Sequence, residues 1–424
     1  MGYAVRAGRV TRRRGLPPAH RATTAEVRSI YPFVAPEPLG AQTCYLGREA
    51  TGSAFCFDPW ECYEAGVLTG PNMVVMGQIG RGKSAFVKSF IWRQLAFGRQ
   101  CWVLDPKGEY GGLAAACGTV PLKIGPGAGL RLNPFDAAPT DAGRGHQGRC
   151  ELLAALLASS LGRALLPEER AAADVALGAA EARARVPTLP LVAEALLNPE
   201  ESQARLLGTD AQGLRQDGRQ LALELRRLVQ GDLAGMFDGE TTPGTDLGGR
   251  LVVLDLSLIY GSPALGLLMV CAMSWLQSAL LSRDSGRTAK RLLVLDEAWA
   301  LLSQLETAEW LRATFKLSRS YGVANIAVVH RLSDLRAAGR EGSQQERLAV
   351  GLLSDAETRV VFGQAAADAE QAGRLLGLSG TEVELLGQLP RGVALWKVGS
   401  RSYLVEHDLS PKELALTDTD SAMR

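Results

Sequence analysis

The sequence lacks a large net charge. Lys and Arg together number 46 against 45 Asp and Glu, which gives +1, so bulk positive charge cannot be a reason for nucleic-acid binding. The balance is uneven along the chain. The first 25 residues hold six Arg and no acidic residue, whereas residues 26–424 carry 40 basic and 45 acidic side chains, a net charge of −5. Only eight of the basic residues are Lys, so a single Arg is weaker evidence of function than a single Lys.

The sequence also lacks a cysteine framework and a secretory leader. Its few cysteines are too scattered for a set of disulfides, and no C-x-x-C pair is present to hold zinc. A reducing cytosol is the compartment that this pattern favours. The basic N-terminus has no apolar stretch of the kind found in signal peptides. The cysteines are residues 44, 56, 62, 101, 117, 150 and 271.

One uncharged segment, residues 256–282, is long enough to span a bilayer. It contains several polar residues and directly follows a strand-like run that ends at Asp255. We therefore expect a buried strand end and a core helix here, rather than a membrane span.

Short apolar runs alternate with helical stretches over most of the chain. Continuous apolar strands separated by helices are typical of a parallel sheet that is covered on both faces. The sequence therefore predicts an α/β fold with a mostly parallel sheet and helices on both faces. The runs are MVVM at 73, CWVLD at 101, LVVLDL at 251, LLVLDE at 292, NIAVV at 325 and RVVF at 359.

A length of 424 residues suggests two to three domains at roughly 150 residues each. Changes in composition along the sequence divide the chain into parts. The stretch from 136 to 236 contains no Phe, Trp or Tyr and has Ala and Leu at helical spacing, which predicts an all-α insertion. Its Leu stripes form either the insertion's own core, which we favour, or a partner-binding face. The complete division is a basic disordered arm (1–40), a small β leader region (41–70), an α/β core (71–135 and 237–411) around the insertion (136–236), and a flexible tail (412–424).

The strongest motif is GQIGRGKS, which lies between the strand-like MVVM and a helical stretch. Its glycines let the backbone approach phosphate oxygens closely, and the start of the helix adds partial positive charge. Lys83 is predicted to reach the β- and γ-phosphates of ATP, and the Ser84 hydroxyl to bind Mg²⁺. The predicted nucleotide-binding residues are Gly77, Gln78, Ile79, Gly80, Arg81, Gly82, Lys83, Ser84 and Ala85.

The second motif is LLVLDE, an apolar strand that delivers two adjacent carboxylates at its carboxyl end, where α/β sheets bind ligands. Adjacent acids on a strand cannot both face one metal ion. We expect Asp296 to bind Mg²⁺ and Glu297 to polarise the water that attacks the γ-phosphate. A nucleotide kinase needs no such glutamate, so the pair favours hydrolysis.

Further candidates follow other strands. His330 ends NIAVV and is either a sensor of the γ-phosphate or a hydrogen-bonded histidine that closes the strand. Arg319 and Arg359 could act on a neighbouring subunit's γ-phosphate as arginine fingers. DPKGEY (105–110) and NPFD (133–136) place acids at the ligand edge, although their Pro and Gly residues could simply form turns.

These motifs, in this order, resemble the HerA–FtsK superfamily, and within it the VirB/TraC-type ATPases of conjugative type IV secretion. The resemblance runs from about residue 57 to residue 411 and rests on FDP, GQIGRGKS, VLDPKGEY, LNPFD, GDLAGMFDGET, VVLDLS, LVLDEAWALL, SRSYG and LPRGVALWKVG. It implies a P-loop NTPase fold of the RecA-like (ASCE) type, with ATP and Mg²⁺ as cofactors. It also implies a nucleotide-binding role for Gly77–Ser84, a Mg²⁺-side role for Asp296, catalysis by Glu297 and a finger in trans from Arg319.

The sequence departs from this family at two places. The family usually has Gln where His330 stands, and we expect the large region that precedes the core in the family to be missing here or reduced to about 70 residues. The resemblance implies a homo-oligomer, with a hexameric ring as one form, at the cytoplasmic face of the plasma membrane. The partners would be membrane-embedded secretion components, and DNA would be contacted indirectly or through a pore.

The main functional hypothesis is thus an oligomeric motor that hydrolyses ATP to energise a conjugation or secretion apparatus. One alternative is a HerA- or FtsK-like translocase or coupling protein that pumps DNA itself. Another is a scaffold that binds ATP to assemble and hydrolyses it little. Glu297 argues against the scaffold, and the absence of visible N-terminal membrane helices argues against a coupling protein.

Overall fold

The computed structural model describes most of the chain. It covers residues 39, 41–136, 142–232, 234–243, 245, 249–262, 265–266, 268–272, 290–298, 308, 311–312, 315–316, 322–329, 351 and 355–417. The Arg-rich arm up to residue 38, Arg319 and His330 lie outside these residues.

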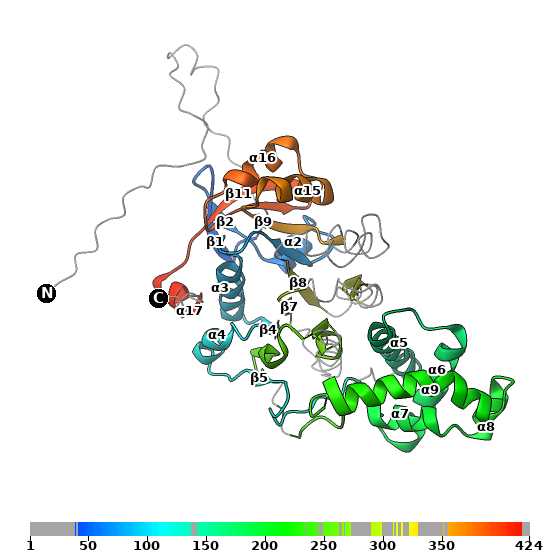
Figure 1. Cartoon of the computed structure of the whole chain (residues 1–424). Helices are drawn as coiled ribbons and strands as arrows, with labels where there is room; N and C mark the ends of the chain where they lie inside the picture. The colour runs from blue at the N-terminus through cyan, green and yellow to red at the C-terminus, as the bar shows by residue number, and fades with distance from the viewer. Residues whose placement is uncertain are drawn as a thin grey trace, which may run out of the picture.

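Within the described residues, the strands form one eleven-stranded sheet in the order β2-β1-β11-β10-β9-β3-β8-β7-β4-β6-β5 (Figure 1). The seven strands from β9 to β5 pair in parallel, and the four others join antiparallel at one side. This confirms the predicted mostly parallel α/β sheet. The strands are β1 (Tyr45–Glu49), β2 (Ala54–Cys56), β3 (Met73–Met76), β4 (Gln100–Asp105), β5 (Leu122–Lys123), β6 (Leu251–Asp255), β7 (Arg291–Leu295), β8 (Val323–Val329), β9 (Thr358–Phe362), β10 (Val393–Val398) and β11 (Arg401–His407).

Helices follow several of the strands in the chain. Those with defined bounds in the described residues are α2 (Pro59–Glu64), α3 (Lys83–Ala96), α4 (Gly111–Ala116), α5 (Ala142–Leu161), α6 (Pro167–Arg183), α7 (Leu189–Leu197), α8 (Glu201–Leu206), α9 (Ala211–Arg227), α15 (Ala366–Leu376), α16 (Gly380–Gln388) and α17 (Pro411–Thr417).

Both faces of the sheet are buried. Successive side chains of a strand point to opposite faces, and the side chains on both sides of β3 are buried. In β3, Met73 and Val75 pack with α3 and α4 on one face. Val74 and Met76 belong to the core of the other face, which also includes α15 and the helices α5–α9. The continuous apolar strands of the sequence therefore reflect coverage on both sides.

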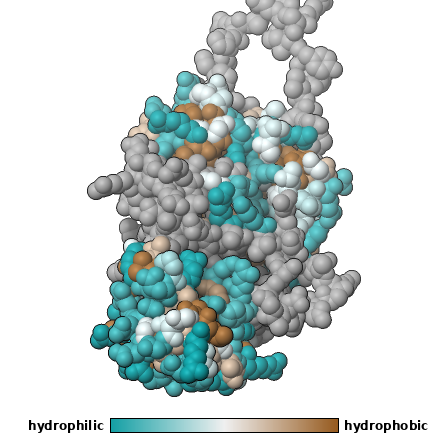
Figure 2. All heavy atoms as spheres, turned by 90° about the vertical axis from the view of Figure 1, so that its right-hand side faces the viewer, coloured by the Kyte–Doolittle hydropathy of each residue, from teal (hydrophilic) through white to brown (hydrophobic). Residues whose placement is uncertain are grey.

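Helices α5–α9 form a separate layer beside the sheet, between β5 and β6 in the chain (Figure 1). Its two ends meet, since the Leu132 amide donates to the Met236 carbonyl (2.7 Å) and the Thr242 amide donates to the Arg131 carbonyl (2.9 Å). The Leu stripes face inward and bury Leu156, Leu177 and Leu221 among others. The outer face of this layer is mainly hydrophilic with small hydrophobic patches (Figure 2), which agrees with the insertion's own core rather than a partner-binding stripe.

The hairpin expected in the leader region is β1–β2, and it extends the main sheet by pairing with β11. The hairpin after Pro390 is β10–β11, which turns at Gly399 and Ser400 as expected. An aromatic cluster of Phe55, Phe57, Phe86, Trp396 and Tyr403 joins these strands to α3. The leader therefore packs directly on the helix that begins at the predicted phosphate loop.

Two parts of the predicted division were wrong. Residues 412–417 are not a flexible tail, because they belong to α17 and Glu413 is buried between Ser89 and Arg93 of α3. Leu39 does not belong to a disordered arm, since its side chain is buried in the core and its carbonyl accepts from the Cys62 thiol.

None of the helices that the structure describes combines the length and the apolar character that a membrane crossing requires. In the uncharged segment 256–282, the first part follows β6 with a short 3₁₀ turn, Ser257–Ile259. Residues 273–282 lie outside the described residues.

Candidate functional site

The segment GQIGRGKS forms a tight loop between β3 and α3. Gly77, Gly80 and Gly82 have positive φ angles of 155°, 80° and 108°, which side chains with a Cβ rarely adopt. A Cβ on Gly77 would lie 2.5 Å from the Cβ of Phe362. The glycines thus allow both the backbone conformation of the loop and its close contact with β9.

Neighbouring segments hold this loop in place. The Gln78 amide donates to the Gly363 carbonyl (3.0 Å), and the Gly392 amide donates to the Arg81 carbonyl (3.0 Å). Ile79 and Gly80 are exposed at the tip, while Arg81, Ser84 and Ala85 are half-buried. The loop is therefore fixed at its base and open to solvent at its tip.

Lys83 begins α3 and is only 3% exposed. Its ammonium donates to the carbonyls of Gly77 (2.5 Å) and Gln78 (3.0 Å). The side chain of Lys83 therefore folds back over the loop that precedes it, and its ammonium group lies against the loop backbone.

The order of the strands sets which residues meet at the carboxyl edge of the sheet. β8 lies between β3 and β7, and β4 lies on the other side of β7. Asp105 pairs in register with Asp255 of β6, and the Asp296 amide, just after β7, donates to the Leu104 carbonyl (3.2 Å). Three buried aspartates thus lie at the ends of three adjacent strands, at one edge.

The adjacent acids Asp296 and Glu297 point to different partners. The Asp296 carboxylate accepts from the Tyr110 hydroxyl (3.2 Å) and from the Glu297 amide (3.0 Å). Glu297 is 2% exposed, has a φ of 53° and forms an ion pair with Lys107. It is the one non-glycine residue with positive φ among the described residues, a conformation that is strained for a residue with a Cβ. Backbone strain of this kind is often found at functional sites.

Sequence reasoning missed the role of Lys107 and Tyr110 in DPKGEY. The Asp105 carboxylate accepts four backbone N–H groups, from residues 107–110, at 2.9–3.2 Å. This turn places Lys107 against Glu297 and Tyr110 against Asp296. Burial raises the pKa of Asp105, although the backbone hydrogen bonds partly offset it. The scarcity of Lys was the signal that could have drawn attention to Lys107.

The pKa of Lys107 reflects its position. Burial lowers it, but the hydrogen bond and the charge of Glu297 outweigh burial, and the pKa of Lys107 is raised overall. The lysine therefore remains charged beside Glu297 over the physiological pH range.

Lys88 is a second lysine that sequence reasoning missed. It lies on α3, five residues after Lys83, and is 1% exposed with its ammonium 3.8 Å from Glu109 and over the ring of Tyr110. Burial lowers the pKa of Lys88, and the carboxylates of Glu109, Asp105 and Asp296 counteract that effect only in part. The helix after the phosphate loop and the acidic strand ends are thus electrostatically coupled.

Of the other candidates, two lie outside the described residues and two make structural hydrogen bonds. His330 directly follows β8, and it lies with Arg319 outside the described residues. Arg359 lies within β9, and its guanidinium donates to the carbonyls of Ala356 (3.1 Å) and Leu376 (3.0 Å). These bonds favour a structural role for Arg359 over a role on a neighbour's phosphate. Asn133 likewise closes a turn by accepting from the Phe135 amide at 3.1 Å.

Comparisons of the sequence with protein-family models find no match. A search of curated proteins finds none either.

Comparison with solved structures finds clear similarity. The structure of VirB4 of Thermoanaerobacter pseudethanolicus has a TM-score of 0.71 at 21% sequence identity, covering 88% of this chain and all of that one. The bacterial conjugative coupling protein TrwBdeltaN70 has a TM-score of 0.57 at 15% identity over 88% of this chain and 90% of its own. The plasmid coupling protein TrwB in complex with ADP and Mg²⁺ has a TM-score of 0.55 at 16% identity, covering 88% and 91%. This chain therefore has the P-loop NTPase fold that VirB4 and TrwB share.

Proposed function

We propose that the protein is a Mg²⁺-dependent ATPase, and that it acts as an oligomeric motor energising a conjugative DNA-transfer or type IV secretion apparatus. One observation carries the proposal most. The phosphate loop after β3 and the Asp296–Glu297 pair after β7 lie at the same edge of the sheet, with one strand between them. A nucleotide bound at this edge would present its phosphates to the loop on one side and to the pair of acids on the other. The solved structures of TrwB with an ATP analogue and with ADP and Mg²⁺ support the same assignment.

The proposed roles follow from the chemistry of each group. Residues Gly77–Ala85 would bind the phosphates through their N–H groups, and Lys83 would exchange its present carbonyl partners for phosphate oxygens. Glu297 would orient and deprotonate the attacking water. His330 would sense the γ-phosphate, and Arg319 would reach the site of a neighbouring subunit.

The donor groups present suit Mg²⁺. Ser84 offers a hydroxyl oxygen, and Asp296 offers a carboxylate oxygen that is already oriented by Tyr110. Mg²⁺ prefers oxygen ligands and is usually bound by one or two protein side chains together with phosphate oxygens of the substrate. When bound, the ion would neutralise charge that develops on the phosphates. Asp105 is less suited to the same task, because four backbone N–H groups of residues 107–110 already converge on its carboxylate.

We also propose the surroundings of this motor. It would form a homo-oligomer, with a hexameric ring as one form, at the cytoplasmic side of the membrane beside embedded secretion components. The chain would divide into the nucleotide-binding core of residues 71–135 and 237–411 and an insertion at 136–236. Sizing of the purified chain with and without ATP tests the oligomer, and an ATP-independent monomer would contradict it.

Phosphate release from ATP by the purified chain, with and without Mg²⁺, tests the enzymatic part. We expect Mg²⁺-dependent release that is lost in Lys83→Met together with most of the ATP affinity. Lys123→Met is the matched control, because Lys123 is exposed on β5 and lies outside the proposed site. Equal ATP binding by Lys83→Met and the wild type would contradict the proposal.

The two alternatives separate in the same assay. A DNA-pumping translocase predicts strong stimulation by double-stranded DNA that weakens as salt rises. An assembly scaffold predicts an ATP-dependent increase in molecular size with negligible phosphate release. The main proposal predicts both assembly and release, with little response to DNA alone.

A further inference from the structure

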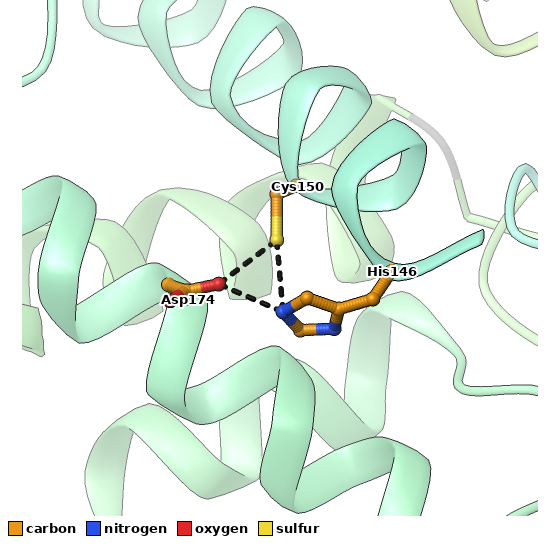
Figure 3. Close-up of side chains that lie close together, drawn as sticks. All are labelled: His146, Cys150 and Asp174. Carbon is orange, nitrogen blue, oxygen red and sulfur yellow. Dashed lines mark hydrogen bonds and ion pairs between the residues drawn. The ribbon is translucent and has the colours of Figure 1, made fainter. Parts of the chain in front are cut away.

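A cluster of three potential metal ligands lies in the helical layer, far along the chain from the proposed nucleotide site. His146 and Cys150 stand four residues apart on α5 and so share one face of the helix. Asp174 comes from the neighbouring helix α6. Figure 3 shows the imidazole, the thiol and the carboxylate directed at one point between the two helices.

The donor atoms are close enough to bind one ion. His146 Nε2 lies 2.9 Å from Asp174 Oδ1 and 3.3 Å from Cys150 Sγ, and the thiol lies 3.0 Å from the same carboxylate oxygen. Zinc binds nitrogen and oxygen ligands at about 2.0–2.2 Å and sulfur at about 2.3 Å. An ion slightly to one side of the three atoms can therefore satisfy these distances with small shifts of the side chains.

A second observation points to a ligand. His146 Nδ1 lies 2.7 Å from Glu181 Oε2, and Glu181 is held by Arg149 at 2.6 Å. A carboxylate that accepts Nδ1–H fixes the orientation of the ring, so that Nε2 faces Cys150 and Asp174 and offers its lone pair to an ion that replaces the Nε2 proton. This carboxylate–histidine pairing is the usual support of a metal-binding histidine.

We propose that His146, Cys150 and Asp174 form a binding site for a zinc-class transition-metal ion that ties α5 to α6. The nitrogen, sulfur and oxygen donors suit such an ion, whereas Mg²⁺ and Ca²⁺ prefer oxygen alone. The side chains of His146 and Asp174 are 36% and 57% exposed, so the ion is reached from solvent and its fourth position is open to water. A search for C-x-x-C pairs cannot find this site, because its ligands come from two helices.

In the metal-free state the same groups form a hydrogen-bonded cluster. The Cys150 thiol donates to Asp174, and burial together with that carboxylate raises the pKa of Cys150 to about 12. A metal ion that binds Cys150 Sγ and His146 Nε2 replaces the protons on both atoms, and these protons are released to solvent.

Cobalt(II) is the probe that tests the site, because its thiolate complexes absorb in the near ultraviolet. The untagged full chain is stripped with a chelator and titrated with Co²⁺ in the absence of nucleotide. We expect one Co²⁺ per chain, a thiolate-to-cobalt band and its loss when Zn²⁺ is added. No saturable band in the wild type would overturn the proposal.

Variants assign the ligands. Cys150→Ser is expected to abolish the band, while Cys117→Ser, a change at another partly buried free thiol, is expected to retain it. Glu181→Gln keeps the three ligands and is expected to weaken Co²⁺ binding about 10–100-fold. If Cys150→Ser fails to fold, His146→Gln serves instead. An unchanged band in either variant would contradict the assignment.

Thermal unfolding tests the link between the helices. Zn²⁺ is expected to raise the Tm of the wild type and of Cys117→Ser but not that of Cys150→Ser. A wild-type Tm that does not respond to Zn²⁺ would contradict a tie between α5 and α6.

Discussion

At the scale of single residues, the candidate site shows a pair that the sequence does not reveal. The catalytic candidate Glu297 is buried and paired with Lys107, which comes from a motif nearly 200 positions earlier. Asp296 and Glu297 could be predicted because both follow one apolar strand. Their partners could not, because the turn that delivers Lys107 and Tyr110 depends on four hydrogen bonds to Asp105 that only the folded backbone provides.

The Lys107–Glu297 pair makes a measurable contribution to stability. Lys107→Met removes this cation from a buried carboxylate, and we expect the free energy of unfolding to fall by roughly 1–3 kcal/mol, which is less than for a fully buried pair because Lys107 is 26% exposed. Adding Glu297→Gln removes the buried charge and should recover part of the loss. Urea unfolding of the four proteins of this double-mutant cycle measures the coupling, and purely additive effects would argue against it.

His407 gives the protein a predicted acid sensitivity. It accepts from Trp396 Nε1 (3.0 Å), donates from Nδ1 to the Gly392 carbonyl (3.1 Å) and packs against Phe86. Burial lowers the pKa of His407 from 6.5 to about 4. The unfolded chain therefore takes up this proton at higher pH than the folded chain, and the stability from neutral His407 is lost as the pH falls from about 6.5 to 4.

The expected loss over this range is on the order of 3 kcal/mol. Unfolding free energies of the wild type and His407→Gln at several pH values measure it, since glutamine cannot take up the proton. The difference between the two curves should narrow as the pH falls. Parallel curves over this pH range would show that His407 does not titrate in this way.

At the scale of secondary structure, strands were easier to predict than the ends of the chain. Apolar runs identified β3, β4, β6, β7, β8 and β9 to within a few residues, because strands buried on both faces need apolar side chains throughout. The two-residue strand β5 leaves no such pattern. Helix α17 was missed because its sequence is short and partly polar, and its position depends on contacts with α3.

The contact between α17 and α3 rests on Glu413. Its carboxylate accepts from Ser89 Oγ (2.8 Å) and from Arg93 Nε (2.6 Å), so it connects the chain's last described helix to the helix after the phosphate loop. Burial raises the pKa of Glu413, but Arg93 and the other hydrogen bonds outweigh it and lower it to about 2. The contribution is thus present above pH 4.5 and is lost as the pH falls toward about 2.

Glu413→Ala is expected to lower the free energy of unfolding by about 1.5–3 kcal/mol at neutral pH, the range for hydrogen bonds to charged groups. Glu370→Ala, at an exposed position on α15, is the matched control and should change stability little. Thermal or urea unfolding measures both. Equal effects of the two variants would mean that α17 is not anchored through Glu413.

At the scale of the whole molecule, the structure shows how the length of the chain is used and the sequence shows where its charge lies. The residues that the structure describes form one sheet with a helical layer beside it. The order β3-β8-β7-β4 brings together motifs that are separated by more than 200 residues, and sequence reasoning could expect this only through resemblance to a family. The net charge of −5 over residues 26–424 directs the search for an anionic partner to the Arg-rich arm or to a pore, and not to the general surface.

The central claim, that the acidic strand end hydrolyses ATP bound at the phosphate loop, is tested most directly by Glu297→Gln. The variant keeps the size and polarity of the side chain but cannot act as a base. Single-turnover phosphate release is measured beside equilibrium binding of ATP and Mg²⁺. The account predicts unchanged ATP binding and phosphate release that is about 10²–10⁴-fold slower than in the wild type. Phosphate release at the wild-type rate by Glu297→Gln would contradict it.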